Sequence, residues 1–244
     1  MKKGKALGIA LAVLLFLGGI FYALYPVVAG RYLSYVYTKQ AEHFLRTSEE
    51  AAATPDPDAV LLWEAKDRPY AELYNAMQAY NEAIFADKQA GLCDAWAYQE
   101  PCFDLAAYGI EEGIFGVVSI PAMDVELPIY LGATNENMAK GAVHLSQTSL
   151  PLGDTNTNCV LTAHRGWYDA PYFRYIERLQ IGDTVTVTTL WQTLTYTVSE
   201  IKVIEPNDID QILIQPGREL LTLLTCHPYA SGGRYRYVVY CERM

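Results

Sequence analysis

The first pattern along the chain is an uncharged, mostly apolar run from Ala6 to Gly30. Its core is long enough for a membrane-spanning helix, because about 20 apolar residues at about 1.5 Å each cross a hydrocarbon layer of about 30 Å. Lys2, Lys3 and Lys5 precede this run. Because positively charged flanks stay on the cytoplasmic side, the pattern predicts a single-pass anchor in the cell membrane, residues 1–30, with the N-terminus in the cytoplasm and the catalytic domain extracytoplasmic.

A cleaved signal peptide is the alternative for this run, since Val27 and Ala29 loosely resemble a small-residue cleavage site. The run is longer than such a signal requires, which favours the anchor. Both interpretations export the remainder of the chain.

Residues 31–91 have the spacing of helices. The residues that recur with this spacing are Tyr70, Leu73, Met77, Tyr80 and Ile84. Asp56 or Asp58 would cap a helix that begins near Ala59. Residues 92–112 change in character and predict a loop, which contains two cysteines.

From residue 113 to residue 244 the pattern predicts short strands. The segment 184–188 alternates Thr and Val, as a half-buried strand should. The predicted strands are 115–120, 125–131, 158–163, 183–189, 194–204, 220–226 and 235–241, with short helices at 134–140 and 170–179. Many short strands with few helices indicate a mainly β domain, a closed or nearly closed β-barrel.

Composition narrows the range of functions. The net charge of -10 argues against a nucleic-acid partner, because such proteins need a basic face to neutralise phosphates. The sequence has neither Cys-x-x-Cys nor His-x-x-x-His, so no metal and no other cofactor is expected. It has five cysteines, an odd number, which leaves at least one thiol without an intrachain partner in an exported protein.

Three residues suit nucleophilic acyl transfer. Cys226 and His164 each end an apolar segment predicted as a strand, and a nearby imidazole helps a thiol to form the thiolate. Arg236 begins an alternating strand whose antiparallel pairing with 220–226 would bring it beside Cys226. A guanidinium there can donate to an oxyanion. Arg234 has the same parity and is the rival, and a buried structural cysteine with surface charges is the plainer interpretation.

The motifs around these residues resemble those of the sortase family. Thr222–Cys226 matches the Thr-Leu-x-Thr-Cys motif, Thr162–Gly166 is similar to the histidine motif, and Arg236–Tyr240 is similar to the strand that carries the essential arginine. Further similarity is found in Leu127–Tyr130, Gly141–Leu145 and Gly182-Asp183. The resemblance extends from Ile114 to the C-terminus.

This resemblance implies a sortase-type closed β-barrel and a transpeptidation. Cys226 would attack the Thr–Gly bond of an LPXTG-like sorting signal to give a thioacyl enzyme, His164 would handle the protons and Arg236 would stabilise the oxyanion. Thr225 and Ala163 are the candidate substrate-binding residues. The implied partners are pilins or surface proteins with such a signal, and an amine acceptor, either a pilin lysine or a peptidoglycan stem.

The two predicted helices before the barrel resemble class C, the pilin-polymerising sortases. That class has a lid loop with Asp-Pro-Phe or Asp-Pro-Trp, and Asp94-Ala95-Trp96 occupies the matching place. The likeness implies that Asp94 pairs with the active-site arginine and that Trp96 covers Cys226. Two features depart from class C: Ala95 replaces the proline, and a C-terminal membrane helix is absent. The segment after Cys226 is instead similar to classes B and D.

Cys93 and Cys102 flank this lid and could form a small disulfide that stiffens it. Cys159 and Cys241 lie on predicted strands and are expected in the core. The thiol of Cys226 would then be the reactive one.

Other classes of protein fit less well. A papain-like protease would have its cysteine near a helix start and its histidine downstream, and the Ser-x-Gly-Cys-type motif of an L,D-transpeptidase is missing. A non-catalytic, sortase-like binding or assembly module is the alternative from a different class, and the three retained motifs argue against it.

Overall fold

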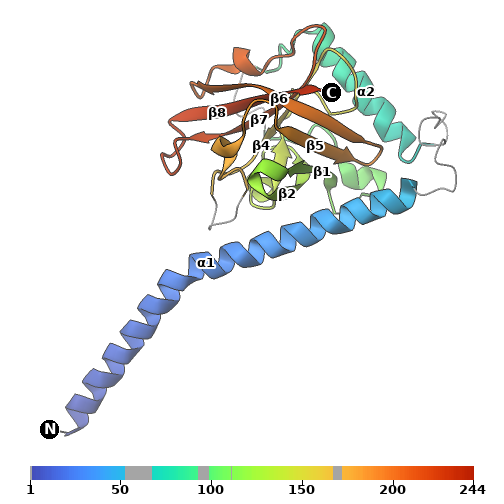
Figure 1. The fold of residues 1–244 in the computed structure, drawn as a ribbon. Coiled ribbons are helices and arrows are strands. Elements are labelled where there is room, and N and C mark those ends of the chain that lie inside the picture. Colours follow the sequence, from blue (N-terminus) through green and yellow to red (C-terminus); the bar gives the residue numbers. More distant parts are fainter. Residues whose placement is uncertain (1, 53–67, 93–98, 111, 167–171) are drawn as a thin grey trace.

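The computed structural model describes residues 2–52, 68–92, 99–110, 112–166 and 172–244. A long helix, α1 (Lys2–Ala52), is followed by α2 (Ala71–Ala86) and then by a closed barrel, to which the described residues contribute eight strands (Figure 1). The strands are β1 (Ile114–Ile120), β2 (Val125–Leu131), β3 (Ala142–His144), β4 (Thr157–Thr162), β5 (Thr184–Thr189), β6 (Thr193–Ile204), β7 (Glu219–His227) and β8 (Tyr235–Arg243). The short helical turns are η3 (Leu105–Tyr108), η4 (Pro121–Met123), α3 (Asn135–Met138), η5 (Ile176–Arg178) and η6 (Ile209–Ile212). The predicted closed barrel is confirmed.

The strands follow the order β1-β2-β3-β4-β7-β8-β6-β5 around the barrel. Two neighbouring pairs, β2 with β3 and β4 with β7, are parallel, and the others are antiparallel. The C-terminal ends of β4 and β7 therefore meet the N-terminal end of β8 at one end of the barrel. This meeting point positions the candidate site.

Alternation of apolar and polar side chains explains why these segments form a barrel. In β5, Val185 and Val187 are fully buried and the intervening threonines point outward. The paired strand β6 buries Leu194, Tyr196 and Val198 in the same way. Each such burial stabilises the fold by roughly 1.5–3 kcal/mol.

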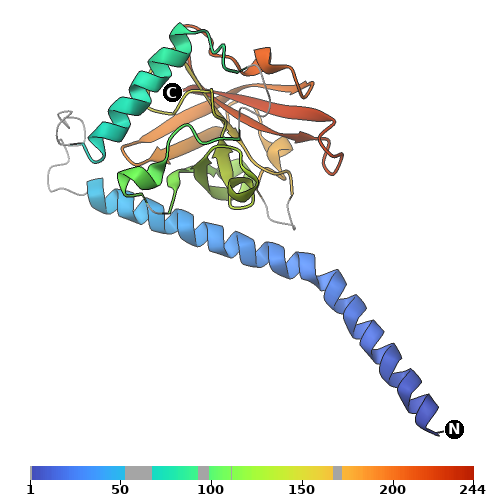
Figure 2. The ribbon, with the colours of Figure 1, turned by 180° about the vertical axis from the view of Figure 1, so that it is seen from behind.

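Helix α1 has two different halves. Its side chains from Leu7 to Val28 are largely exposed and apolar, and among the described helices α1 has the length and composition to cross a membrane. Pro26 lies inside the helix, and Figures 1 and 2 show that α1 bends in its N-terminal half. A proline inside a helix removes one backbone hydrogen bond and is a common cause of such a bend.

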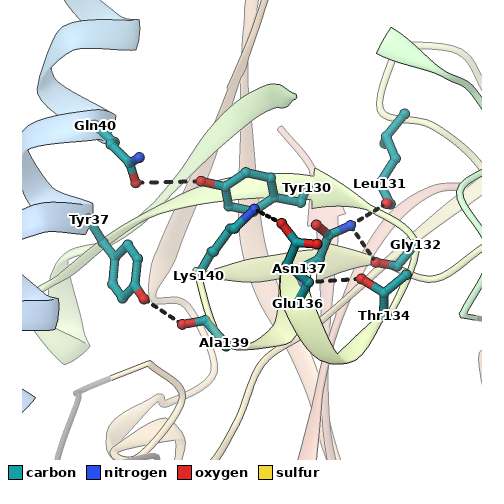
Figure 3. Close-up of polar contacts among 10 residues, drawn as sticks. All are labelled: Tyr37, Gln40, Tyr130, Leu131, Gly132, Thr134, Glu136, Asn137, Ala139 and Lys140. Atoms are coloured by element: carbon teal, nitrogen blue, oxygen red, sulfur yellow. Dashed lines mark hydrogen bonds and ion pairs between the residues drawn. The ribbon is translucent and has the colours of Figure 1, made fainter. Parts of the chain in front are cut away.

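The second half of α1 packs against the barrel beside β2. Tyr37 is buried, and its hydroxyl donates to the carbonyl oxygen of Ala139 (Figure 3). Tyr172 donates to the same oxygen over 2.7 Å. One turn along α1, Gln40 Oε1 accepts from the hydroxyl of Tyr130 at 3.5 Å. The contacts of Tyr37 and Gln40 join α1 to the residue after α3 and to β2, respectively.

Helix α2 lies along one side of the barrel (Figures 1 and 2). Its buried residues Leu73, Met77 and Ile84 follow the predicted helical spacing. The side chain of Asn81 donates to the carbonyl of Leu150 and accepts from its N–H, at 2.9 and 2.8 Å. A buried amide with both groups paired makes this contact specific.

Three sequence predictions differ from the structure or fall outside it. The helix predicted at 170–179 is wrong for its described part, which forms turns and the short η5. Strand β3 was not predicted as a strand. The helix start expected near Ala59, with its cap at Asp56 or Asp58, lies outside the described residues.

Candidate active site

Cys226 and Arg236 face each other on neighbouring strands. The antiparallel register of β7 and β8 pairs their Cα atoms directly. Residues opposite each other in this way have side chains on the same face of the sheet. The predicted pairing of these two strands is therefore confirmed, and the residue opposite the thiol is Arg236, whereas the exposed Arg234 precedes β8.

His164 lies two residues beyond the end of β4. The parallel register of β4 and β7 pairs Thr162 with Leu224. His164 and Cys226 each lie two residues beyond this pair, on their own segments. Thr162 Oγ1 donates to the carbonyl oxygen of Leu224 over 2.9 Å, which fixes this register. His164, just beyond β4, and Cys226, near the end of β7, are therefore brought side by side at this end of the barrel.

Thr225 and Ala163, the predicted substrate-binding residues, join the two segments. Thr225 Oγ1 donates to the carbonyl oxygen of Ala163 over 2.7 Å, and both residues are buried. Because they directly precede Cys226 and His164, this hydrogen bond sets the spacing of the two candidate catalytic residues. Their contact with substrate stays a prediction.

The thiol of Cys226 and the guanidinium of Arg236 both lie close to Gly233. A Cβ atom on Gly233 would lie 3.2 Å from Cys226 Sγ and 2.9 Å from Arg236 Nη1. The same Nη1 donates to the carbonyl oxygen of Gly233 over 2.8 Å. The double glycine Gly232-Gly233 before Arg236 is the sequence signal for this close approach.

Replacing Gly233 by alanine is expected to slow alkylation of Cys226 by a thiol reagent by about tenfold, because the methyl group must displace the sulfur or the guanidinium. Gly232→Ala is the matched control, since Gly232 also has a positive φ of +70° but has no atom within 4 Å of the added Cβ. Both variants should lose about 1–2 kcal/mol of stability to backbone strain. Equal alkylation rates in the two variants would show that Gly233 does not border the reactive sulfur.

Burial shifts the pKa values of several thiols and of His164, and so sets their protonation states. Burial raises the pKa of Cys102 and of Cys241 to about 12 and also raises the pKa of Cys159, so these thiols stay protonated. Burial lowers the pKa of His164, because it disfavours the charged imidazolium. His164 is therefore predominantly neutral at pH 7 and able to accept a proton.

The predicted lid residues Asp94 and Trp96 lie outside the described residues. Within the described part of the chain, Arg236 has no acidic partner, and its Nη1 donates to two backbone carbonyls of the turn. Cys102 is a free thiol whose sulfur lies 3.9 Å from Nδ1 of His144, so the suggested bridge is not seen in this structure. Cys93 lies outside the described residues, and the disulfide stays a prediction.

The segment that follows the lid region is held on the barrel. Ser146 Oγ donates to the carbonyl oxygen of Glu100. A Cβ on Gly132 would lie 2.6 Å from the backbone nitrogen of Pro101, so only glycine allows this close approach. Residues 99–104, which precede η3, therefore have a defined path across the barrel.

Comparison with known proteins assigns the family. The family model described as the sortase domain matches residues 118–244. The chain belongs to the sortase family.

Individual relatives agree with this assignment. Sortase D from Bacillus subtilis is 30% identical over 131 residues, which cover 53% of this chain and 63% of that protein. Among solved structures, Sortase C1 of GBS Pilus Island 1 has a TM-score of 0.69 at 29% identity and covers 85% of this chain and 98% of its own. A lid mutant of Streptococcus agalactiae Sortase C1 has a TM-score of 0.63 at 31% identity and covers 72% of this chain and 89% of its own. The barrel and the helices before it thus resemble solved C-type sortases.

Proposed function

We propose that the protein is a cysteine transpeptidase that cleaves an LPXTG-like sorting signal between Thr and Gly and joins the Thr carbonyl to an amine. The observation that carries this proposal is the placement of Cys226 opposite Arg236, with His164 two residues beyond the end of the adjoining strand β4. Similarity to sortases supports the reaction type. The C-type structural relatives support a role in pilus assembly.

The steps follow from the chemistry of the three side chains. Cys226 Sγ attacks the Thr carbonyl carbon after His164 takes the thiol proton, and Arg236 donates to the oxyanion of the tetrahedral intermediate. The C–N bond then breaks, and the Gly amine leaves with the proton that His164 returns. The incoming amine gives a proton to His164, attacks the thioester carbon and releases Cys226.

Helix α1 would anchor the enzyme in the membrane with its lysine-rich N-terminus in the cytoplasm. The barrel would then face the exterior, where sorting signals and amine acceptors meet it. After the anchor, the proposed functional units are a helical region (residues 31–91), a lid loop (92–112) and the catalytic barrel (113–244).

A second candidate is a class B- or D-like sortase that anchors proteins to peptidoglycan. The 30% identity with Sortase D of Bacillus subtilis favours it. The two candidates share the thioacyl step and differ in the amine that resolves it, a pilin lysine or a peptidoglycan stem.

Mass spectrometry of the full chain in lipid nanodiscs with LPXTG-type peptides tests the proposal. We expect cleavage after Thr and an acyl adduct on Cys226, with transfer to a supplied amine and loss of both in Cys226→Ala. If the wild type is silent, Trp96→Ala should open the proposed lid and restore the adduct. Silence of both proteins across a peptide library would instead indicate the non-catalytic module.

A further inference from the structure

Arg165 is a buried cation directly behind the candidate nucleophile. Its Nη1 donates to the backbone carbonyl oxygen of Cys226 over 3.3 Å and to Nδ1 of His227 over 2.8 Å. Its Nη2 forms an ion pair with Glu177 Oε2 at 2.6 Å. The side chain of Arg165 is only 3% exposed, whereas that of Glu177 is 51% exposed.

These contacts join three separate segments at the site. Arg165 follows His164, Glu177 lies in η5, and His227 ends β7. The ring of His227 packs on that of Tyr237, with centroids 5.5 Å apart. One guanidinium therefore holds both the backbone of Cys226 and the side chain of His227, the last residue of β7 before the turn that leads to β8.

The ion pair also sets the charge near the thiol. Burial of an arginine without a carboxylate partner would be costly, and Arg165 Nε has no hydrogen-bond partner among the described residues. Glu177 partly neutralises Arg165. Among the described residues, the charged or titratable groups around Cys226 include Arg236 from β8, His164 beyond β4, Arg165, Glu177, His227 and Tyr237, whose ring packs on His227 and faces Arg165.

We propose that Arg165 and Glu177 are a positioning pair for the nucleophile: Arg165 fixes the carbonyl of Cys226 and favours its thiolate, and Glu177 moderates that cation. Neither residue contacts the reacting atoms. The proposal rests on Cys226 being the nucleophile. It predicts that removal of the cation and removal of the carboxylate change Cys226 reactivity in opposite directions, which a purely structural pair would not do.

The test is the pH profile of Cys226 alkylation by iodoacetamide in the full chain in nanodiscs, followed by peptide-level mass spectrometry. Arg165→Gln should move the midpoint of the profile to higher pH, because a cation near a thiolate favours its formation. Glu177→Gln should move the midpoint down. Arg165→Lys keeps the charge and should stay close to the wild type, and Arg178→Gln, an exposed arginine over the ring of Tyr175, is the control without effect.

Two results would overturn the positioning role: an unchanged midpoint in both variants, or shifts of both in the same direction. If Arg165→Gln does not fold, Glu177→Gln decides, because its carboxylate is half exposed. A downward shift supports the role and an unchanged midpoint rejects it. The wild-type rate, compared with that of the urea-unfolded chain, separately tests whether Cys226 is the reactive thiol.

Discussion

Arg236→Gln is expected to lower kcat for peptide cleavage by about 10²–10³-fold with little change in KM, because loss of one oxyanion donor raises the barrier by about 2.7–4 kcal/mol. The register opposite Cys226 and the closeness of both side chains to Gly233 place this guanidinium where the negative charge would form. Arg236→Lys keeps the charge but not the planar fork of donors, so it should recover only part of the rate. Steady-state kinetics of peptide cleavage measures each effect.

Arg234→Gln is the matched control for this prediction. Arg234 is exposed and lies before β8, yet it has the same parity along the chain as Arg236. Arg236 also holds the carbonyls of Gly233 and Tyr235, at 2.8 and 3.2 Å, so a thermal melt must accompany the kinetics. Equal rates in the two glutamine variants, with equal melting temperatures, would remove Arg236 from the oxyanion step.

The choice between Arg234 and Arg236 illustrates the limit of the sequence. Alternation in 235–241 predicts a strand and its pairing with 220–226, both of which the structure confirms. Parity alone permits either arginine, because the side-chain period of a strand is two. The register that decides between them depends on the length and path of the turn from Pro228 to Arg234, which local patterns do not encode.

A similar limit explains the helix wrongly predicted at 170–179. Phe173, Ile176 and Leu179 recur every three residues and are all buried. This spacing fits a 3₁₀ turn, with three residues per turn, as well as it fits an α-helix. Their spacing therefore could not distinguish between the two backbones.

No local sequence pattern predicts the contacts of Arg165. Arg165 follows β4 and Glu177 lies in η5, and the spacing between them matches no helix or strand period, so only the tertiary fold brings them together behind Cys226. The sequence identified Arg165 as part of a histidine motif and gave it no role. Such long-range ion pairs depend on tertiary packing, which neither periodicity nor composition predicts.

His164→Gln is expected to lower kcat/KM for peptide cleavage by about 10²–10⁴-fold, the range for loss of a positioned acid–base group. His43→Gln is the matched control, since His43 is exposed on α1. Alkylation of Cys226 at pH 7 should also slow in the His164 variant, because the imidazole proposed to take the thiol proton is gone.

The lowered pKa of His164 also predicts where the acid limb of kcat/KM lies. Burial lowers the pKa of His164 below its ordinary value of 6.5, so the neutral base persists to more acid pH than in the unfolded chain. The acid limb of kcat/KM in the wild type should therefore lie below pH 6.5 and disappear in His164→Gln. The same shift makes folding less favourable as pH falls through 6.5, because the unfolded state then binds the proton more readily. An acid limb that survives in the variant at the same pH would assign the titration to another group and leave His164 without its role as base.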